Sequence, residues 1–212
     1  MSKITKPIPL PVSRGPVEHA RREQIVAAAC EQVRAHGYGK TSVAEVAKAV
    51  GVSSAYVYRF FESKQSIGEA VCAENLARIA QSLFDLENAP WTAAEKLRRF
   101  YSVLLESGYE LFIAQRNLHE LVSSAVSQNW IAAANHRKVI RAVLRRIVVE
   151  GRKNSEFERD TPLDEVVLAL GQAAIPFAHP ILLAQRDLKD LRMSAAAVSG
   201  LVLRGLAPSS EQ

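Results

Sequence analysis

Two short helical patterns joined by three residues constrain the fold of this chain more than any other feature. The first begins with the S-x-x-E capping box of Ser42 and Glu45 and continues with apolar residues at helical spacing, at Val43, Val46, Ala47 and Val50. Gly51 ends this pattern, and a second short helix is expected from Ser54 to about Phe60. Two short helices joined by a glycine-containing turn form the helix-turn-helix motif, whose second helix enters the major groove of DNA. The pattern therefore predicts a DNA-binding unit near the N-terminus.

The expected second helix and the residue after it carry four aromatic side chains, and a helical wheel separates them. Val57 and Phe61 fall on one side, where they can pack against the valines of the first helix. Tyr58 and Phe60 lie on the flanks, where a phenolic hydroxyl or a ring edge can meet the sugar-phosphate backbone.

The side of this helix that faces away from the core carries Ala55, Tyr56 and Arg59. Arg59 can donate two hydrogen bonds to a guanine, and the small Ala55 permits close approach to a thymine methyl group. Hydroxyl and ammonium groups at nearby helix N-termini can hold phosphates. These groups belong to Thr41, Ser42 and Lys64.

The rest of the chain is also predicted to be helical, because no stretch alternates apolar and polar residues over strand length. Helices are expected over residues 16–36, 64–86, 92–115, 117–127, 131–151, 162–183 and 189–206. The polar, turn-rich segment RKNSEFERDTP is expected to be a loop. The fold class is therefore all-α, with a flexible, basic, proline-rich arm over residues 1–15, a helix-turn-helix domain over 16–64 and a larger helical domain over 65–212.

The positive charge of the chain is concentrated in its first third. Residues 1–64 contain ten Lys or Arg against five Glu, whereas residues 65–212 contain 17 of each sign. A one-sided basic excess is expected of a region that meets a polyanion, although a solvated basic face would look the same.

The remaining composition excludes several other classes of protein. Charges interrupt every apolar stretch before the roughly 18 residues that a membrane span needs, and Pro7, Pro9 and Pro11 interrupt the N-terminus, so neither a span nor a signal peptide is expected. A cytoplasmic protein without a membrane partner follows as the expectation. Cys30 and Cys72 lie in alanine-rich helical stretches without metal-ligand spacing and are interpreted as buried, reduced thiols.

The stretch GYGKTSVAEVAKAVGVSSAYVYRFFESKQSI carries a resemblance to a known family. Residues 17–70 resemble the N-terminal DNA-binding region of TetR-family (TetR/AcrR-type) transcriptional repressors. The resemblance implies a three-helix DNA-binding domain followed by a larger helical domain for ligand binding and dimerisation. It places the base-facing positions at Ser54, Ala55, Tyr56 and Arg59, and the phosphate contacts at Thr41, Ser42, Tyr58 and Lys64.

Three positions depart from the family pattern. Phe60 stands where many members have a phosphate-contacting histidine, which puts one phosphate contact in doubt. Tyr56 replaces a commonly small residue and should alter the DNA sequence that is recognised. Glu62 stands where a turn proline is frequent, and this change should be harmless.

An enzyme is the main alternative class. The GKT at residues 39–41 is similar to the end of a P-loop, but Arg34 occupies the position where that motif needs its first glycine. The histidines, at residues 19, 36, 119, 136 and 179, lie on different predicted helices without metal-ligand spacing. We therefore expect no catalysis, no metal and no cofactor. A second alternative is a DNA-binding protein of similar fold with no small-molecule sensing role, which the long, neutral C-terminal part opposes.

The favoured interpretation is a ligand-responsive repressor that binds a palindromic operator as a homodimer and is released by a small apolar or amphiphilic inducer. Large apolar residues mixed with polar ones in the middle helices, together with the family architecture they resemble, are the pocket candidates. They are Phe100, Tyr101, Leu104, Leu105, Gly108, Tyr109, Phe112, Leu118, His119, Leu121, Trp130, Asn135, Val139, Phe177 and His179.

The last two long helices are expected to build the dimer as a four-helix interface. Their apolar sides contain Leu163, Val166, Val167, Leu170 and Ala174 on the first helix, and Ala195, Val198, Leu201, Val202, Leu203 and Leu206 on the second. Small residues would permit close approach of the backbones, namely Ala169, Ala173, Ala196, Ser199 and Gly200. The alternative is that the core of the monomer buries these faces.

Overall fold

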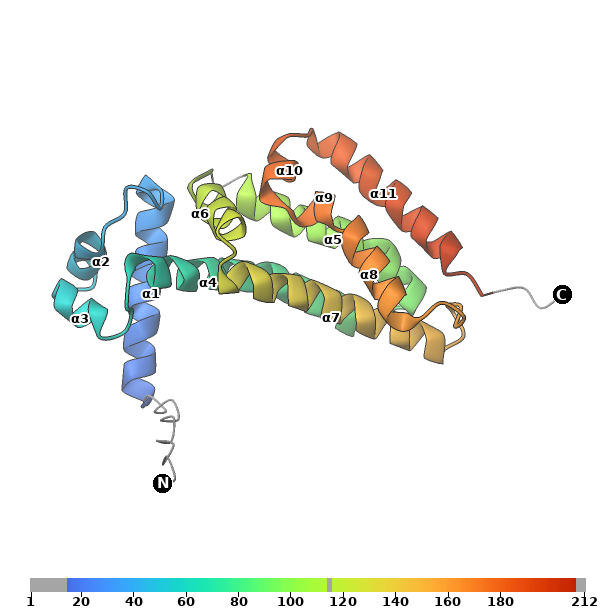
Figure 1. Cartoon of the computed structure of the whole chain (residues 1–212), viewed down its shortest axis with the longest axis horizontal. Helices are drawn as coiled ribbons and strands as arrows, with labels where there is room; N and C mark the ends of the chain where they lie inside the picture. The colour runs from blue at the N-terminus through green and yellow to red at the C-terminus, as the bar shows by residue number, and fades with distance from the viewer. Residues whose placement is uncertain (1–14, 114–115, 209–212) are drawn as a thin grey trace, which may run out of the picture.

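The computed structural model in Figure 1 describes residues 15–113 and 116–208 of the chain. Every regular element in these ranges is a helix, which confirms the all-α prediction. The arm predicted over residues 1–15 lies outside the described residues except for Gly15. None of the helices in the described ranges combines the length and the apolar character that crossing a membrane requires.

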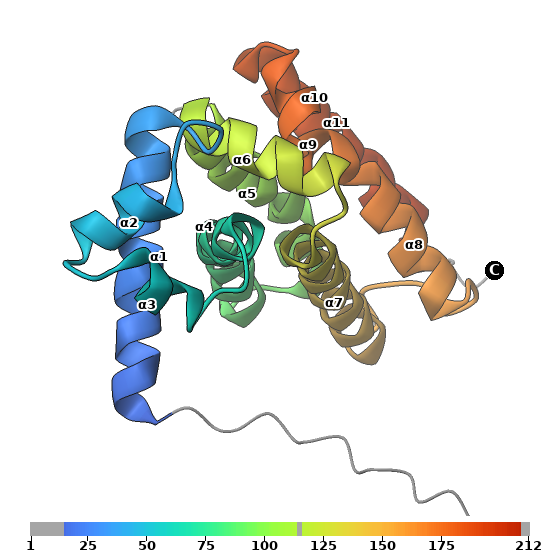
Figure 2. The ribbon, with the colours of Figure 1, turned by 60° about the vertical axis from the view of Figure 1, so that its left-hand side comes forward.

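Three helices form a unit at one end of the molecule: α1 (Pro16–His36), α2 (Val43–Ala49) and α3 (Ser54–Tyr58). Figures 1 and 2 show these helices grouped on one side of the remaining helices. Their shared core holds Val46 of α2 and Val57 of α3 against Ile25 and Val33 of α1. The helix α3 ends at Tyr58, two residues before its expected end, because Phe61 turns into this core and is 3% exposed.

The long helix α4 (Lys64–Asn88) leads from this unit into the rest of the molecule, where α5 (Ala93–Phe112), α6 (Arg116–Ser127) and α7 (Ile131–Lys153) follow. Figures 1 and 2 show α4 and α7 side by side, with α5 next to them. Ser63 and Thr92 cap the N-termini of α4 and α5, as serine and threonine do at helix starts. Glu156, from the loop after α7, also accepts hydrogen bonds from the first two backbone N–H groups of α5.

One buried ion pair joins α5 to α7. The Lys96 side chain is 7% exposed, and its ammonium lies 2.9 Å from both carboxylate oxygens of Glu150. A buried ammonium without such a partner is strongly destabilising, so the pair helps to fix the two helices against each other.

The chain after residue 162 differs from the single helix predicted over 162–183. It forms α8 (Leu163–Ala173), α9 (Ile175–Ala178) and α10 (Pro180–Ala184), followed by α11 (Leu188–Gly205). The prediction was wrong because Pro176 and Pro180 lack backbone N–H donors, and each lies at the first or second position of a new short helix. The resulting bent path passes over α5 (Figure 1) and leaves space beside α7.

Candidate DNA interface and ligand cavity

The helix-turn-helix unit is held in shape by hydrogen bonds at its own helix ends. The Ser42 hydroxyl accepts a bond from the Glu45 backbone N–H at 3.2 Å, while the Glu45 carboxylate accepts from the Ser42 backbone N–H at 2.8 Å. Hydrogen bonds from the Ser42 hydroxyl and then from its backbone N–H lower the pKa of Glu45. Ser53 caps α3 through the Tyr56 N–H, and Gly51 adopts a φ of 70° in the connecting turn. A side chain would strain that left-handed conformation.

The two sides of α3 differ in burial as the helical wheel predicts. Val57 is fully buried, whereas Ala55 and Arg59 are exposed and Tyr58 is 50% exposed. The Arg59 guanidinium lies 5.4 Å from the centre of the Tyr56 ring, close enough for a cation-π contact that orients the arginine. Ser54 is half-buried beside this surface. The four residues predicted to face bases therefore lie on one accessible helix, and their contact with DNA stays a prediction.

The residues predicted to hold phosphates lie in two kinds of environment. Ser42 and Tyr58 are exposed next to α3. Thr41 is 6% exposed, and its hydroxyl donates to the Gly37 carbonyl oxygen at 2.9 Å. The Lys64 ammonium donates to the Gly39 carbonyl oxygen at 3.1 Å. These two side chains hold the loop between α1 and α2, and their role as phosphate contacts stays a prediction.

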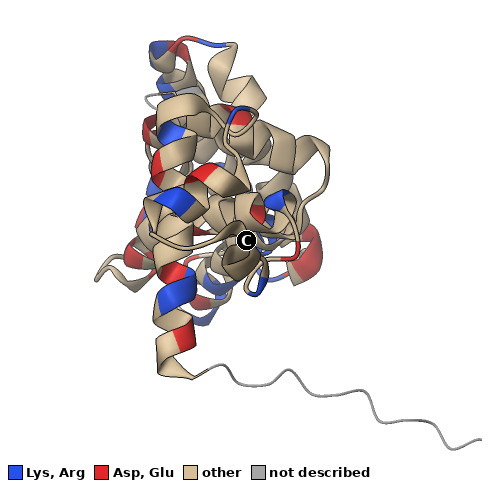
Figure 3. Ribbon diagram, turned by 90° about the vertical axis from the view of Figure 1, so that its left-hand side faces the viewer, with Lys and Arg blue, Asp and Glu red and all other residues tan. Residues whose placement is uncertain are grey.

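The basic excess is smaller on the described part of this unit than over the whole of residues 1–64. Three of the ten Lys and Arg among residues 1–64, Lys3, Lys6 and Arg14, lie outside the described residues, which leaves seven against five Glu. Figure 3 views the molecule from the α1 side and shows basic and acidic segments interspersed along α1. Two exposed basic residues of the helix-turn-helix are Lys48 on α2 and Arg59, the residue after α3.

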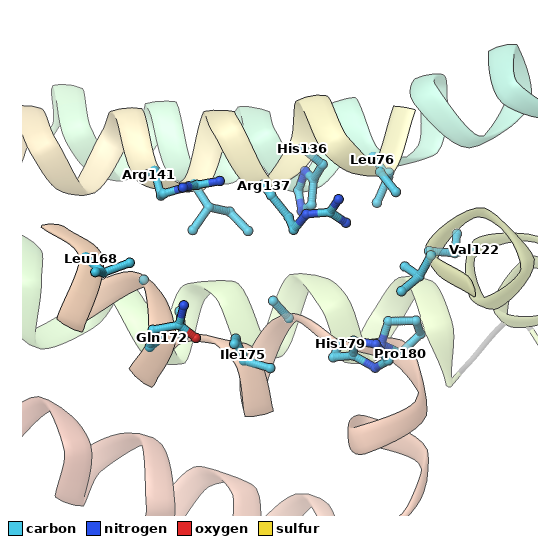
Figure 4. Close-up of a pocket in the computed structure, with 16 residues that line it drawn as sticks. Leu76, Val122, His136, Arg137, Arg141, Leu168, Gln172, Ile175, His179 and Pro180 are labelled. Atoms are coloured by element: carbon cyan, nitrogen blue, oxygen red, sulfur yellow. The ribbon is translucent and has the colours of Figure 1, made fainter. Parts of the chain in front are cut away.

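A separate cavity of about 190 Å³ lies between α7 and the bent segment α8–α10, with α6 closing one end (Figure 4). Most of its wall is apolar. The lining residues are Leu76, Val122, Val126, Ala133, His136, Arg137, Ile140, Arg141, Leu168, Gly171, Gln172, Ala174, Ile175, Ala178, His179 and Pro180. Concave, largely apolar sites with a few polar groups are typical of small-molecule binding.

The sequence-predicted pocket overlaps with this lining at His179. The core residues among the others are packed in the interior, where each is no more than 2% exposed: Phe100, Tyr101, Leu104, Leu105, Leu118, Leu121, Trp130 and Phe177. Gly108 is also buried, and it lies outside the lining. Outside the lining there are also three half-buried residues, Tyr109, His119 and Val139, and the exposed Asn135. The Phe112 side chain lies outside the described residues. Contact of any of these residues with a ligand stays a prediction.

Sequence reasoning missed the polar part of the lining on α7. His136, Arg137, Ile140 and Arg141 follow Ala133 at spacings of three, four, seven and eight residues, which places them along one stripe of the helix. A stripe that mixes small apolar side chains with arginines is unusual for a helix packed in a core, and this signal could have identified the site.

Two histidines line the cavity, one on α7 and one beside α10. Burial, followed by the nearby positive charge of Arg137, lowers the pKa of His136 to about 4, so this imidazole is neutral at pH 7. His179 is the N-cap residue of the short helix α10, and its buried Nδ1 atom has no hydrogen-bond partner among the described residues. A buried polar atom without a partner is costly, and a bound ligand could supply one.

The predicted dimer residues are divided between the core of the single chain and its surface. Val166, Leu170 and Ser199 are buried, and Val167, Ala174, Ala195 and Leu206 are buried with them. Ala169 and Ala196 are exposed, and Ala173, Gly200 and Leu203 are half-buried. The large apolar side chains most exposed on these helices are Leu168, which also lines the cavity, Met193 and Leu201, at 52%, 60% and 66%. Their part in a dimer stays a prediction.

The DNA-binding unit and the helical domain are joined by packed side chains. Tyr38, in the loop before α2, makes an edge contact with the Trp130 ring at 5.6 Å. Both rings press on Gly68 of α4, where an added Cβ would lie 2.6 Å from Tyr38 and 3.1 Å from Trp130. The side-chain amide of Asn117, on α6, donates a hydrogen bond of 2.7 Å to the backbone carbonyl oxygen of Arg34, which lies in the last turn of α1.

Comparison with known proteins gives two family matches. Residues 25–71 match the model of bacterial regulatory proteins of the tetR family, and residues 93–199 match that of the tetracyclin repressor-like C-terminal domain. A fatty acid metabolism regulator protein of Bacillus subtilis (strain 168) is 26% identical over 95 residues, which cover 45% of this chain and 47% of that protein. The chain thus matches about half the length of this curated relative.

Two solved structures share the fold over most of the chain. The transcriptional regulator FadR from Bacillus subtilis in complex with stearoyl-CoA is 20% identical, with a TM-score of 0.59, 90% of this chain covered and 99% of that chain. RolR in complex with resorcinol is 17% identical, with a TM-score of 0.64 and 92% of each chain covered. At these identities the likeness concerns the fold.

Proposed function

This chain belongs to the TetR family of bacterial regulatory proteins, and from that premise we propose that it is a ligand-responsive transcriptional repressor. It would bind a palindromic operator as a homodimer and leave it when a small molecule occupies the cavity beside α7. Such a protein would act in the cytoplasm, where its DNA lies.

The observation that carries this proposal is the presence, in one chain, of an accessible α3 surface and a separate apolar cavity with helices that touch both. The helix α4 begins at Lys64, beside the α1–α2 loop, and contributes Leu76 to the cavity wall. The helix α6 bonds to α1 through Asn117 and lines the cavity with Val122 and Val126. A ligand that moves α6 or α4 would therefore move α3 relative to its symmetry mate.

The ligands named for two structures of the same fold support a small-molecule role. FadR was solved with stearoyl-CoA and RolR with resorcinol. One is a long amphiphile and the other a small aromatic, so the fold accepts ligands of very different size. A ligand can shift the protein between two states only by binding one of them more tightly.

The exposed apolar residues of α8 and α11 support the homodimer. On α11, Met193 and Leu201 are both more than half exposed, and Ala169 of α8 is exposed as well. Large exposed apolar side chains mark interaction surfaces. A twofold pairing of this face would present two α3 helices to successive major grooves, roughly 34 to 36 Å apart.

Selection of a duplex from a random library, followed by affinity titration, tests this proposal. Affinity should fall steeply with salt, and scrambling one half of the palindrome should weaken binding strongly, because the two half-sites are bound together. Compounds that raise the melting temperature of the protein should then release it from the selected duplex. A flat salt response, or equal binding to the half-scrambled duplex, would contradict the proposed operator recognition.

The same experiment separates the alternatives. A DNA-binding protein without a sensing role would bind the selected duplex and keep it in the presence of every stabilising compound. The matched families consist of regulators, and we propose no catalytic role.

A further inference from the structure

The cavity beside α7 has a wall of one charge sign. Its polar lining consists of Arg137, Arg141, Gln172 and two histidines, and no Asp or Glu is among the described residues that line it. His136 is neutral at pH 7, so the fixed charge of the wall comes from the two guanidinium groups. Charges next to a low-dielectric wall act more strongly on a ligand than charges in open water.

The two arginines of the cavity differ from the other arginines of α7. Arg145, Arg146 and Arg152 each pair with a carboxylate, those of Asp164, Glu87 and Glu158 respectively. Neither Arg137 nor Arg141 has an ion pair or a hydrogen bond with any residue that the structure describes. Carboxylates therefore neutralise these three other arginines of α7, whereas the two arginines that border the apolar cavity have no such partner among the described residues.

The geometry directs both side chains along the cavity. Figure 4 shows Arg137 reaching into the space between α7 and α9–α10, and Arg141 extending along the wall above Gln172. A Cβ added to Gly171 would lie 3.5 Å from the Cγ of Arg141, so the stem of this arginine passes close to the α8 backbone. Both arginines are exposed, so their charged ends are accessible to solvent.

We propose that the cavity binds an amphiphile whose single anionic end is held by Arg137 and Arg141 and whose apolar part enters between α7 and α8–α10. His179 would orient the polar end through the Nδ1 atom that lacks a partner among the described residues. This inference rests on the proposed function, in which the same cavity is the inducer site.

The ligand chemistry has two sources that share these features. The carboxylate of a free acid and the phosphates of an activated thioester both form paired hydrogen bonds with guanidinium groups. The cavity of about 190 Å³ is smaller than the roughly 300 to 1,000 Å³ of many ligand sites, which favours a short or compact apolar part.

Calorimetric titration of the full chain with four probes that share one alkyl chain tests the charge preference. The probes are octanoate, octanamide, octylamine and octanoyl-CoA. We expect octanoate or octanoyl-CoA to bind at least about tenfold more tightly than octanamide, and octylamine to bind most weakly; a tenfold ratio corresponds to about 1.4 kcal/mol. The stronger of the two anionic probes identifies the source of the anion. Equal affinity for octanamide, a preference for octylamine, or no binding of either anionic probe would overturn the inference.

Variants that remove positive charge inside and outside the lining locate the interaction. Arg137→Gln with Arg141→Gln should remove the preference for the anionic probe, whereas Lys138→Gln, on the same helix outside the lining, should keep it. If the double variant retains the preference, the anion is bound elsewhere. Thermal unfolding of each variant confirms that the affinities refer to folded protein.

Operator release is measured separately on the same samples. An anionic probe that binds through the two arginines but leaves the operator complex intact would contradict the proposed function and leave this inference standing. Release of the operator by neutral compounds alone would support the proposed function and contradict this inference.

Discussion

The DNA-binding unit and the helical domain differ in how their polar groups are satisfied. In the first, the side chains at helix ends already have internal partners: Ser42 bonds to Glu45, Thr41 to Gly37 and Lys64 to Gly39. At the cavity of the second, two guanidinium groups and a buried imidazole nitrogen have no partner among the described residues. The loop and helix ends around α3 are therefore fixed by internal contacts, whereas the cavity has polar groups to which a ligand can bind.

This difference separates recognition of DNA from response to a ligand. A pre-organised surface loses little conformational freedom on binding, which favours rapid and specific docking. A cavity with unsatisfied polar groups gains free energy when a complementary ligand enters, and that gain can stabilise one arrangement of the dimer over another. Changes in either region should therefore affect different measurements.

The largest expected effect comes from separating the two α3 helices of a dimer. Ala169→Glu combined with Leu201→Lys introduces charges at two exposed positions of α8 and α11 and leaves the core of the chain intact. We expect monomers in light scattering and operator affinity lower by a factor on the order of 10² to 10⁴, because linked half-site binding is lost.

Ile131→Lys with Val149→Glu is the matched control. Both positions lie on α7 and are exposed apolar residues, at 66% and 47%, and the net charge change is the same. This variant should remain dimeric and bind the operator normally. A dimer that persists in the α8–α11 variant would mean that the subunits associate through another face.

The second effect compares two side chains within the DNA-binding unit. Arg59→Ala should lower the preference for one base pair at a cost of about 1 to 3 kcal/mol, because one base-edge contact is removed. Lys64→Ala should weaken binding to all sequences alike and reduce the salt slope by about one, if its ammonium exchanges the Gly39 carbonyl for a phosphate. Affinities for the selected operator and for single-base variants, measured over a salt series, distinguish these outcomes. If neither substitution changes the base preference, α3 does not read the operator through Arg59.

The third effect concerns the junction between the two regions. Gly68→Ala would bring a methyl group to 2.6 Å from Tyr38, which forces the Tyr38 and Trp130 rings apart. We expect the free energy of unfolding in urea to fall by about 1 to 3 kcal/mol, the usual cost of overpacking.

Gly205→Ala provides a control for the helix-favouring effect of alanine, since no atom of the described residues lies within 4 Å of the Cβ that it adds. This variant should be as stable as the natural chain or slightly more so. An unchanged stability for Gly68→Ala would show that the contact around Tyr38 can relax, and that the two regions are more loosely coupled than their packing indicates.

The sequence predicted the DNA-binding unit more fully than the helical domain, for a physical reason. Capping boxes, a turn glycine and the period of α2 and α3 are local signals, and they correctly predicted helix positions and the burial of Val57 and Phe61. The break in the segment after residue 162 depends on Pro176 and Pro180. The sequence contains both prolines, but the long apolar run favoured the prediction of one continuous helix over residues 162–183.

The cavity itself could not be located by local signals. It exists where the bent chain at α8–α10 fails to fill the surface of α7, and this depends on contacts between residues far apart in sequence. The sequence-based pocket prediction relied on large aromatic residues such as Phe100 and Tyr101. In the structure these side chains are buried in the core, because large aromatic rings bury the most apolar surface. The cavity wall instead contains small and cationic residues such as Ala133 and Arg137.

The smallest expected effect concerns the cavity wall and tests whether His136 is shielded from water there. His136 has a pKa of about 4 in the folded protein, whereas a histidine in an unfolded chain titrates near about 6.5. As the pH falls through this window the unfolded chain binds a proton that the folded chain does not, so the stability that His136 maintains above about pH 6.5 is progressively lost. Between pH 8 and pH 6 the loss should be about 1 kcal/mol. Urea unfolding of the natural chain and of His136→Gln at both pH values measures it, because the other titrating groups, including His119, cancel in the difference. If the stability difference between the natural chain and His136→Gln does not change with pH, water reaches His136 and the cavity wall beside Arg137 is hydrated.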